Sequence, residues 1–417
     1  MIVLYDGGMP RAGQLKPPTD ERLSDRIAIG LLTRTVPPGL VDEVIAATDT
    51  GEVRKRLLPS RVVVYFVLAM CLFADKGYEE VARLLVEGLA WARRWRGRWE
   101  VPSTAAISNA RVRLGVEPLK VLFAQVARPL AEQGTPGAFY GRWRLVAWDG
   151  TTLDVPDTEV NVAAFGRPGS SRGSGKGAFA QVRVAALAEC GTHAIFAAAM
   201  GALATHESTL VRQLLPRLGA GMLLIADRGL HGFDLWTEAA ATGADLLWRV
   251  KANTVLPVDA MLPDGSYLSH ITAGTDRKKM RPVTVRAVEY TLPGSSQVYR
   301  LITTILDPDA APAAELAAVY HERWEIESTL DELKTHQRGP GMVLRSKHPD
   351  GVTQEVYGFL LVHYAIRELM WQAASREGVD PDRISFTRAI NLIRRQVTSQ
   401  AAFSPHQTGP GVPRRPG

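Results

Sequence analysis

The sequence predicts an α/β protein in which a mixed sheet is flanked by helices and follows an all-helical N-terminal domain. Apolar residues recur at three- and four-residue spacing from Ser24 to about Glu132, which indicates amphipathic helices. Beyond residues 134–137, short runs rich in Val, Leu, Ile and Ala indicate strands buried in a sheet. A polar stretch from Ala252 to about Arg300 then interrupts the pattern, and we interpret it as a β-rich insertion.

The N-terminal region predicts a helical unit that can meet DNA. Its helices are expected at 40–47, 61–73, 78–89, 103–114 and 118–132. Ser103 is a plausible N-cap for a short basic helix carrying Asn109, Arg111 and Arg113, and such a helix can enter a DNA groove. The stretch 91–99 is too long for the turn of a helix-turn-helix. A plain helical bundle with arginines on its solvent face explains the pattern equally well.

The central and C-terminal regions alternate strands with helices. Strands are expected at 144–148, 180–187, 193–199, 222–226, 246–250 and 299–306, and helices at 208–218, 234–241, 311–335 and 353–374. The tail after Ala401 is rich in Pro, Gly and Arg and is expected to be disordered. With 417 residues the chain exceeds a single core. We expect units at 1–135, 138–251, 252–298, 299–375 and 376–417.

Composition says more about the cellular location of the protein than about its activity. A net charge of +6 and a pI near 9.3 suit a protein that meets a polyanion, although a basic soluble protein without such a partner fits equally well. Cys71 and Cys190 lie far apart in apolar segments, so we expect neither a disulfide nor a thiolate metal site. The longest apolar run, 62–74, is too short for a membrane helix and indicates a buried one. We therefore expect a cytoplasmic protein.

Two acidic residues follow predicted buried strands. Asp149 comes after the run 144–148, and Asp227 comes after 222–226. Side chains at the ends of such strands project into the crevice where α/β sheets bind ligands. Two carboxylates in one crevice repel each other unless a cation or a proton lies between them. Each aspartate alone could also be an N-cap for the segment that follows it.

The long helix expected at 311–335 carries a polar quartet on one face. Tyr320, Arg323, Glu327 and Lys334 are spaced by three, four and seven residues, which places them within a narrow arc at 3.6 residues per turn. An apolar stripe runs beside this arc, so the helix is expected to pack on the sheet; its residues are Val319, Ile326, Leu330 and Leu333. A solvated face with ordinary ion pairs is the alternative, because the helix carries many charges.

These residues resemble the signature of the insertion-sequence-4-type DDE transposases. The quartet has that family's Tyr-x2-Arg-x3-Glu-x6-Lys spacing, and the segments around Asp149 and Asp227 resemble its first and second acidic motifs. The resemblance implies an RNase H-like core interrupted by the β-rich insertion. It also implies catalysis by Asp149, Asp227 and Glu327, which would hold two Mg²⁺ ions, with Mn²⁺ able to substitute. Arg323 and Lys334 would then hold phosphates, and Tyr320 would donate a hydrogen bond to one.

The same resemblance implies a reaction and its partners. The family excises its element through a hairpin at the DNA end, which requires a base to leave the stack. Tyr299 stands where the family commonly has a Trp for this step, although a core tyrosine is the simpler interpretation. Arg249 and Lys251 are candidates for contacts with the DNA backbone. Synapsis of two ends implies a homodimer on double-stranded DNA, with no membrane partner.

Two further motifs are rejected. The stretch 166–177 resembles a phosphate-binding loop, but Ser170 stands where its first glycine belongs and Gly177 where its Ser or Thr belongs. The histidines have no metal-binding spacing, and we expect the three in this central region, His193, His206 and His231, at the surface or at helix caps.

The favoured function is a metal-dependent transposase that binds the terminal inverted repeats of an insertion element. One alternative is an immobile nuclease or recombination factor with the same core. The other is a DNA-binding protein without catalysis, in which the acids are structural. Inverted repeats on either side of the gene would favour the transposase. Metal-dependent cleavage would exclude the non-catalytic DNA-binding protein.

Overall fold

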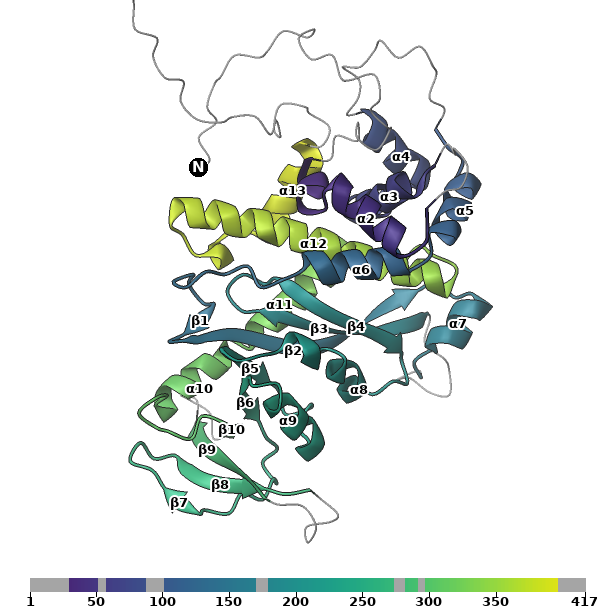
Figure 1. The fold of residues 1–417 in the computed structure, drawn as a ribbon. Coiled ribbons are helices and arrows are strands. Elements are labelled where there is room, and N and C mark those ends of the chain that lie inside the picture. Colours follow the sequence, from purple (N-terminus) through teal and green to yellow (C-terminus); the bar gives the residue numbers. More distant parts are fainter. Residues whose placement is uncertain are drawn as a thin grey trace, which may run out of the picture.

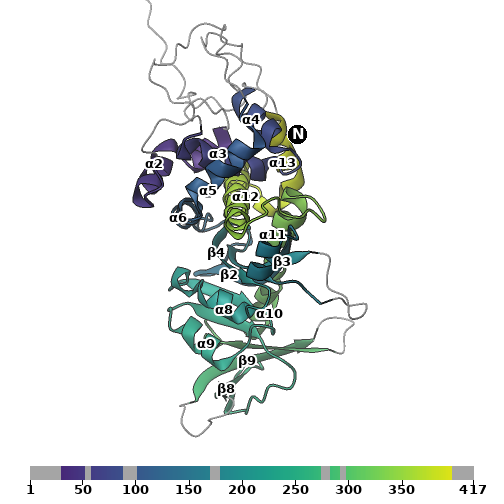
Figure 2. The ribbon, with the colours of Figure 1, turned by 90° about the vertical axis from the view of Figure 1, so that its right-hand side faces the viewer.

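The computed structural model describes residues 30–51, 58–87, 101–169, 179–273, 282–291 and 297–396. A sheet lies across the middle of the molecule (Figure 1). Most N-terminal helices lie above it in this view and strands of the insertion lie at the opposite end, which makes the molecule elongated (Figure 2). This architecture confirms the predicted fold class, a mixed sheet flanked by helices with a helical N-terminal region.

Ten strands among the described residues form one continuous sheet. They are β1 Phe139–Tyr140, β2 Trp143–Val155, β3 Ala180–Glu189, β4 Ile195–Ala202, β5 Met222–Ala226, β6 Asp245–Arg249, β7 Ala260–Met261, β8 Tyr267–Ile271, β9 Val283–Thr291 and β10 Val298–Thr303. The strand order is β4-β3-β2-β5-β6-β10-β9-β8-β7, and β1 pairs with β2. Strands β2, β5 and β6 are parallel neighbours, whereas β3 and β4 run antiparallel to their partners. This is the mixed order of an RNase H-like core.

The insertion extends this sheet. Strand β10 pairs with β6 on one side and with β9 on the other, and β8 and β7 continue the ladder. The insertion is also attached through Arg286 on β9, which is fully buried. Its guanidinium donates to the carbonyl of Ala311 at 2.7 Å and pairs with Asp264. Hydrogen bonds and a buried cation thus connect the insertion to the core.

Helices cover both faces of the sheet. The first ones are α1 Gly30–Thr35, α2 Pro38–Ala47, α3 Ser60–Leu72, α4 Tyr78–Glu87, α5 Thr104–Leu114 and α6 Glu117–Val126. The others are α7 Glu159–Phe165, α8 Glu207–Arg212, α9 Phe233–Ala240, α10 Ala313–His321, α11 Trp324–Asp331, α12 Pro349–Glu377 and α13 Phe386–Gln396. Helices α6 and α12 lie on one face, and α8 and α9 lie on the other (Figure 1).

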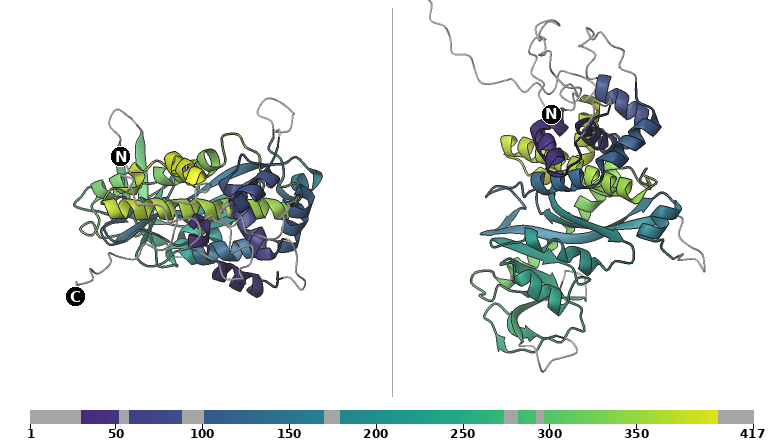
Figure 3. Two further views of the ribbon diagram at one scale, coloured as in Figure 1. Left: turned by 90° about the horizontal axis from the view of Figure 1, so that it is seen from above. Right: turned by 45° about the vertical axis from the view of Figure 1, so that its right-hand side comes forward.

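Two buried helices join the N-terminal region to the sheet. Nearly all of α3 is buried, as its long apolar run predicted, and α12 is buried from Gln354 to Arg367. Seen from above, helix α12 runs along the length of the molecule (Figure 3). The two helices cross at Gly358, where an added Cβ would lie 2.8 Å from the Sγ of Cys71. Only glycine fits this crossing, and Cys71, like Cys190, is a free buried thiol.

The structure corrects the interpretation of α5. Ser103 is its N-cap, as predicted, because its side chain accepts a hydrogen bond from the amide of Ala106. Arg111, however, is only 5% exposed and donates to Gln354 and Ser346, so it cannot reach a DNA groove. The helix pattern did not reveal that this face packs against α12. Of the three residues proposed to read DNA, Asn109 and Arg113 remain exposed.

The helix predicted over 311–335 is broken. Helix α10 ends at His321, a turn at 322–323 follows, and α11 continues as a π-helical turn, Glu332–Gln337. Pro312 precedes α10, so the first helix also begins later than predicted. The apolar stripe nevertheless packs as expected, because Ile326, Leu330 and Leu333 are buried. A π turn adds a residue per turn, so Lys334 departs from the arc that regular spacing gave.

Other boundaries also differ from the predictions. Strand β2 continues to Val155, so Asp149 lies within the strand and not at its end. The helix expected at 208–218 is a short α8 followed by a 3-10 turn, Leu215–Arg217, where Pro216 interrupts the hydrogen bonding. The helix expected at 118–132 ends at Val126, ahead of Pro129. Because β3 pairs with β2 along its whole length, the polar second half of β2 forms a strand that apolar periodicity did not indicate.

Some predictions fall outside the described residues: the stretch 91–99, most of the loop 166–177 and the tail after Ala401. Among the residues that are described, no helix is both long and apolar enough to span a bilayer. His206 is exposed, as expected. His193 is 7% exposed, so its predicted place at the surface is wrong.

Candidate active site

The parallel pairing of β2 with β5 places the two aspartates side by side. Ala147 pairs with Ile225, so the same register, carried two residues further, sets Asp149 opposite Asp227. Neighbouring strands lie about 4.8 Å apart, and residues in register on parallel strands point to the same face. Trp148 points to the opposite face, where it packs against Trp248 with ring centroids 5.5 Å apart. The two carboxylates therefore share the face on which α11 lies.

Helix α11 brings Glu327 to this face together with a cation. Helix α11 packs on β2 and β3. Arg323, 9% exposed, donates from Nη1 to Oε1 of Glu327 at 2.7 Å. Burial lowers the pKa of Arg323, but this hydrogen bond and the charges of Glu327 and Asp227 raise it above its usual value overall. The guanidinium therefore supplies positive charge among the three acids.

Burial disfavours the ionised form of Asp149. Burial raises its pKa to about 6, and the charges of Glu207 and Glu327 act in the same direction. The amide of Gly150 donates to its Oδ1 at 2.7 Å and, with Arg323, opposes the shift. A carboxylate in this position gains most from a nearby divalent cation.

The other members of the predicted quartet differ in their placement. Tyr320 is buried and its hydroxyl donates to Oδ1 of Asp227 at 3.3 Å, while burial and that carboxylate raise the pKa of its phenol. Lys334 is exposed and makes no hydrogen bond or ion pair with the described part of the chain. The structure thus brings Tyr320, Arg323 and Glu327 to the aspartates and leaves Lys334 exposed in the π turn that follows α11.

A row of cationic and aromatic residues continues from the aspartates across the sheet. Ala226 pairs with Trp248, so Arg249 follows Asp227 in register on β6. The guanidinium of Arg249 lies over the ring of Tyr299, 4.2 Å from its centroid. Tyr299 in turn stacks on Tyr290, with ring centroids 5.3 Å apart. Tyr299 therefore packs against both a second aromatic ring and a guanidinium.

Comparison with known proteins identifies the family. The family model described as "Transposase DDE domain" matches residues 142–364, and the one described as "Insertion element 4 transposase N-terminal" matches residues 26–124. The chain belongs to the IS4 family of DDE transposases. This finding confirms the family that the quartet and the two acidic motifs indicated. The protein is accordingly a DNA-cleaving enzyme that binds DNA and uses divalent metal ions.

Individual relatives agree with this assignment. The transposase InsG for insertion sequence element IS4 of Escherichia coli (strain K12) is 27% identical over 376 residues, which covers 88% of this chain and 83% of InsG. The putative transposase InsZ of the same strain is 22% identical over 245 residues, covering 58% and 78%. A cryo-EM structure of a piggyBac transposase synaptic complex with hairpin DNA superposes with a TM-score of 0.46 at 10% identity, covering 89% and 80%.

The oxygen donors of this IS4-family transposase suit hard cations. Asp149, Asp227 and Glu327 offer only carboxylates, which Mg²⁺ and Mn²⁺ prefer. Their charges are partly offset by Arg323, and burial leaves Asp149 poorly compensated. The donor set of these three residues therefore fits divalent metal ions.

One acid of the transposase near this site, Glu207, was not predicted from the sequence. Glu207, the first residue of α8, lies so close to Gly150 that an added Cβ there would be 2.3 Å from its Oε1. Its charge contributes to the raised pKa of Asp149. Because the contact crosses from α8 to the middle of β2, no local spacing could indicate it. In the sequence, only the glycine at position 150 reflects this contact.

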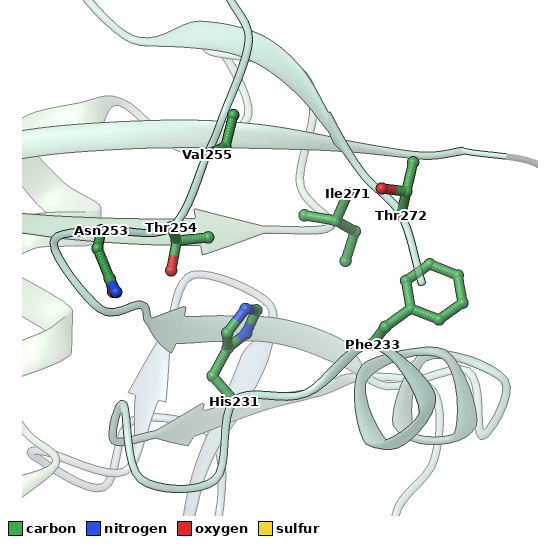
Figure 4. A pocket seen from close by; sticks show the side chains of 7 residues that line it. All are labelled: His231, Phe233, Asn253, Thr254, Val255, Ile271 and Thr272. Carbon is green, nitrogen blue, oxygen red and sulfur yellow. The ribbon is translucent and has the colours of Figure 1, made fainter. Parts of the chain in front are cut away.

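A cavity of about 260 Å³ opens beside the insertion of the transposase (Figure 4). His231, Asn253 and Thr254 line it, together with Phe233. His231 was expected at the surface or at a cap, but it is partly buried and its Nδ1 has no hydrogen-bond partner among the described residues. Burial and the charge of Lys251 lower its pKa. Exposed Lys251 thus lies near this cavity.

Proposed function

We propose that this transposase binds the terminal inverted repeats of an insertion element, cleaves at its ends by two-metal-ion phosphodiester hydrolysis and joins them to target DNA. The observation that carries the proposal is the gathering of Asp149 and Asp227, on adjacent parallel strands, with Glu327 around one buried guanidinium. Two ions held by such acids activate an attacking water or 3′-hydroxyl and stabilise the leaving oxygen of an in-line displacement. The same chemistry cuts DNA and joins it.

Each residue has a proposed part. Asp149, Asp227 and Glu327 would together hold the metal ions, which would activate the attacking oxygen and stabilise the leaving oxygen. Mg²⁺ is the proposed ion, and Mn²⁺ substitutes for it. Arg323 offsets the acids until DNA arrives and then turns to a phosphate, which a guanidinium binds in the same forked geometry as a carboxylate. Lys334, which is exposed, is the second proposed phosphate contact.

The DNA path follows the row of cations across the sheet. Arg249 and Lys251 are proposed contacts with the backbone, since β6 carries Arg249 next to Asp227. The N-terminal unit, 1–135, is proposed to bind the repeats, and the two parts of the core, 138–251 and 299–375, to perform the chemistry. Two ends must be held together, so a homodimer on DNA is expected, acting in the cytoplasm at the nucleoid.

The metal-dependent function is tested by Glu327→Gln. The amide keeps the shape of the side chain but removes a charged metal ligand, so we expect nicking of an end-containing duplex to fall by at least about 100-fold. Asp331→Asn on the same helix is the matched control, because Asp331 is exposed and faces Thr335 and His336. The assay measures nicking with Mg²⁺, with Mn²⁺ and with chelator. Full activity of Glu327→Gln, or nicking that persists in chelator, contradicts the proposal.

A hairpin intermediate is proposed for excision, with Tyr299 as the aromatic residue that receives a displaced base. Its ring packs against Tyr290 and Arg249, and a displaced base takes the place of Arg249 on the ring when that guanidinium moves to a phosphate. Tyr299→Ala should lower the yield of hairpin ends by about 10-fold, since one base–aromatic contact contributes about 1–3 kcal/mol. First-strand nicking should stay near the parent rate. Tyr299→Phe is the control, and equal hairpin yields in Tyr299→Ala and the parent would exclude this role.

A further inference from the structure

Three potential metal ligands meet on the side of α11 that faces away from Glu327. His193 lies in the β3–β4 turn, Glu325 on α11 and Asp382 in the 3-10 turn Pro381–Arg383. Glu325 and Glu327 are two residues apart on a helix, so they point in nearly opposite directions. Among the described residues, this is the group of His, Cys, Asp or Glu side chains whose ligand atoms all lie within 4.8 Å of one another.

The separations match a tetrahedral ion. Nε2 of His193 lies 3.5 Å from Oε2 of Glu325 and 3.2 Å from Oδ1 of Asp382. Bonds of about 2.0–2.2 Å to one central ion place tetrahedral ligands about 3.3–3.6 Å apart. The donor atoms are thus already at the spacing that such an ion would impose.

A buried carboxylate fixes the orientation of His193. Nδ1 of His193 lies 3.2 Å from Oε1 of Glu332, which Arg367 also contacts with its Nε donating to Oε2 at 2.8 Å. Arg367 approaches the same Nδ1, but Arg367 and the ring cannot both act as donors toward each other, and the charged carboxylate is the better acceptor for both. Nδ1 therefore donates to Glu332, and Nε2 faces Glu325 and Asp382. A carboxylate behind the histidine is typical of metal sites.

The local charge favours a cation. The carboxylates of Glu325, Asp382 and Glu332 converge on His193, and Arg367 is the cation that the structure places against them. In the metal-free protein, protons on His193 and Asp382 balance the remaining charge, because hydrogen bonds to Glu325 and Glu332 raise the pKa of His193 despite its burial, and burial raises that of Asp382. A divalent cation between Glu325 and Asp382 takes the place of these protons.

We propose that His193, Glu325 and Asp382 bind a divalent transition-metal ion of the Zn²⁺ class, at a site separate from the three catalytic acids. A cavity of about 540 Å³ borders all three residues and provides an entry path and room for a water as fourth ligand. The imidazole selects against Mg²⁺ and Ca²⁺, which take oxygen ligands. The bound ion joins the β3–β4 turn, α11 and the C-terminal segment, and so fixes the helix that carries Glu327.

The site is tested in the full-length protein with the catalytic acids disabled. In an Asp149→Asn/Glu327→Gln background, stripped of metal, binding of Zn²⁺ is measured by calorimetry and of Co²⁺ by its visible absorption. We expect one ion per chain, with a tetrahedral Co²⁺ spectrum and a higher Tm when Zn²⁺ is added. His193→Gln and Asp382→Asn should each weaken binding by at least about 10- to 100-fold.

His336→Gln is the matched control, because His336 borders the same cavity but contacts Asp331 and Thr387 instead. It should bind Zn²⁺ as the parent does. Asp382 lies near the surface, so Asp382→Asn keeps the test valid if His193→Gln does not fold. Absence of stoichiometric binding, or equal affinity in the parent and Asp382→Asn, overturns the proposal and leaves a protonated His193 in an ion-pair network. Neither result depends on DNA cleavage.

Discussion

Asp149→Asn is expected to abolish DNA cleavage and, at the same time, to stabilise the metal-free protein. Loss of this carboxylate, a proposed metal ligand, should lower cleavage by at least about 10³-fold, more than loss of Glu327. Burial raises the pKa of Asp149 to about 6. The carboxyl group therefore ionises less readily in the folded protein than in the unfolded chain, and its charge lowers the stability of the fold. Replacing it by a neutral amide removes this cost.

The sign of the effect follows from linkage. Below about pH 4 the carboxyl is protonated in both states, so Asp149 adds no charge penalty and the variant gains nothing. As pH rises from about 4 to 6, the unfolded state ionises first and the parent loses stability relative to Asp149→Asn. Above about pH 6 the difference is constant, at about 1–3 kcal/mol. Active-site residues often carry such a cost.

Thermal unfolding at pH 4 and pH 8, with and without Mg²⁺, measures this effect. At pH 8 the variant should have the higher Tm without metal, and Mg²⁺ should raise the Tm of the parent only. Asp154→Asn is the control on the same strand, because Asp154 contacts Gln181 outside the group of acids. A variant less stable than the parent at pH 8 would contradict the burial cost inferred for Asp149.

Arg111→Leu is expected to destabilise the protein by about 3–5 kcal/mol, because it leaves a buried acid without its cation. Arg111 lies 3.8 Å from Glu355, which is 1% exposed, and also donates to the carbonyl of Gly351 at 2.9 Å. These contacts join α5 to α12. Unfolding in urea should show the loss as a lower midpoint with an unchanged slope.

A double-mutant cycle separates this role from DNA binding. Arg111→Leu/Glu355→Leu should recover part of the stability lost in the single variant, since neither charge is then buried alone. Arg113→Ala, at an exposed position on the same helix, should leave stability within about 0.5 kcal/mol of the parent. If Arg111→Leu were as stable as the parent but bound DNA more weakly, the original groove-reading interpretation would be restored.

Local patterns predicted the elements that each bury one continuous apolar face. The runs ending at Trp148 and Ala226 formed strands, and the register of β2 and β5 then brought Asp149 and Asp227 together. The helix quartet was also visible locally, because Arg323 and Glu327 lie one turn apart. These features depend on interactions between residues that are close in sequence or that lie on paired strands.

Features that depend on distant partners could not be predicted. Arg111 is buried by residues more than 200 positions away, and the same sequence on a free helix would place it in water. His193 faces acids from α11 and from the C-terminal segment, whose proximity only the fold reveals. Polar residues after Asp149 form a strand because β3 pairs with them, which no period-two pattern indicated.

The continuous sheet from β4 to β7 restricts movement of the insertion relative to the acids. A hinge between the insertion and the acids would have to break the hydrogen bonds of β10 with β6 or with β9. The insertion is therefore held at a fixed position relative to the acids, and any DNA contact that it makes is fixed with it.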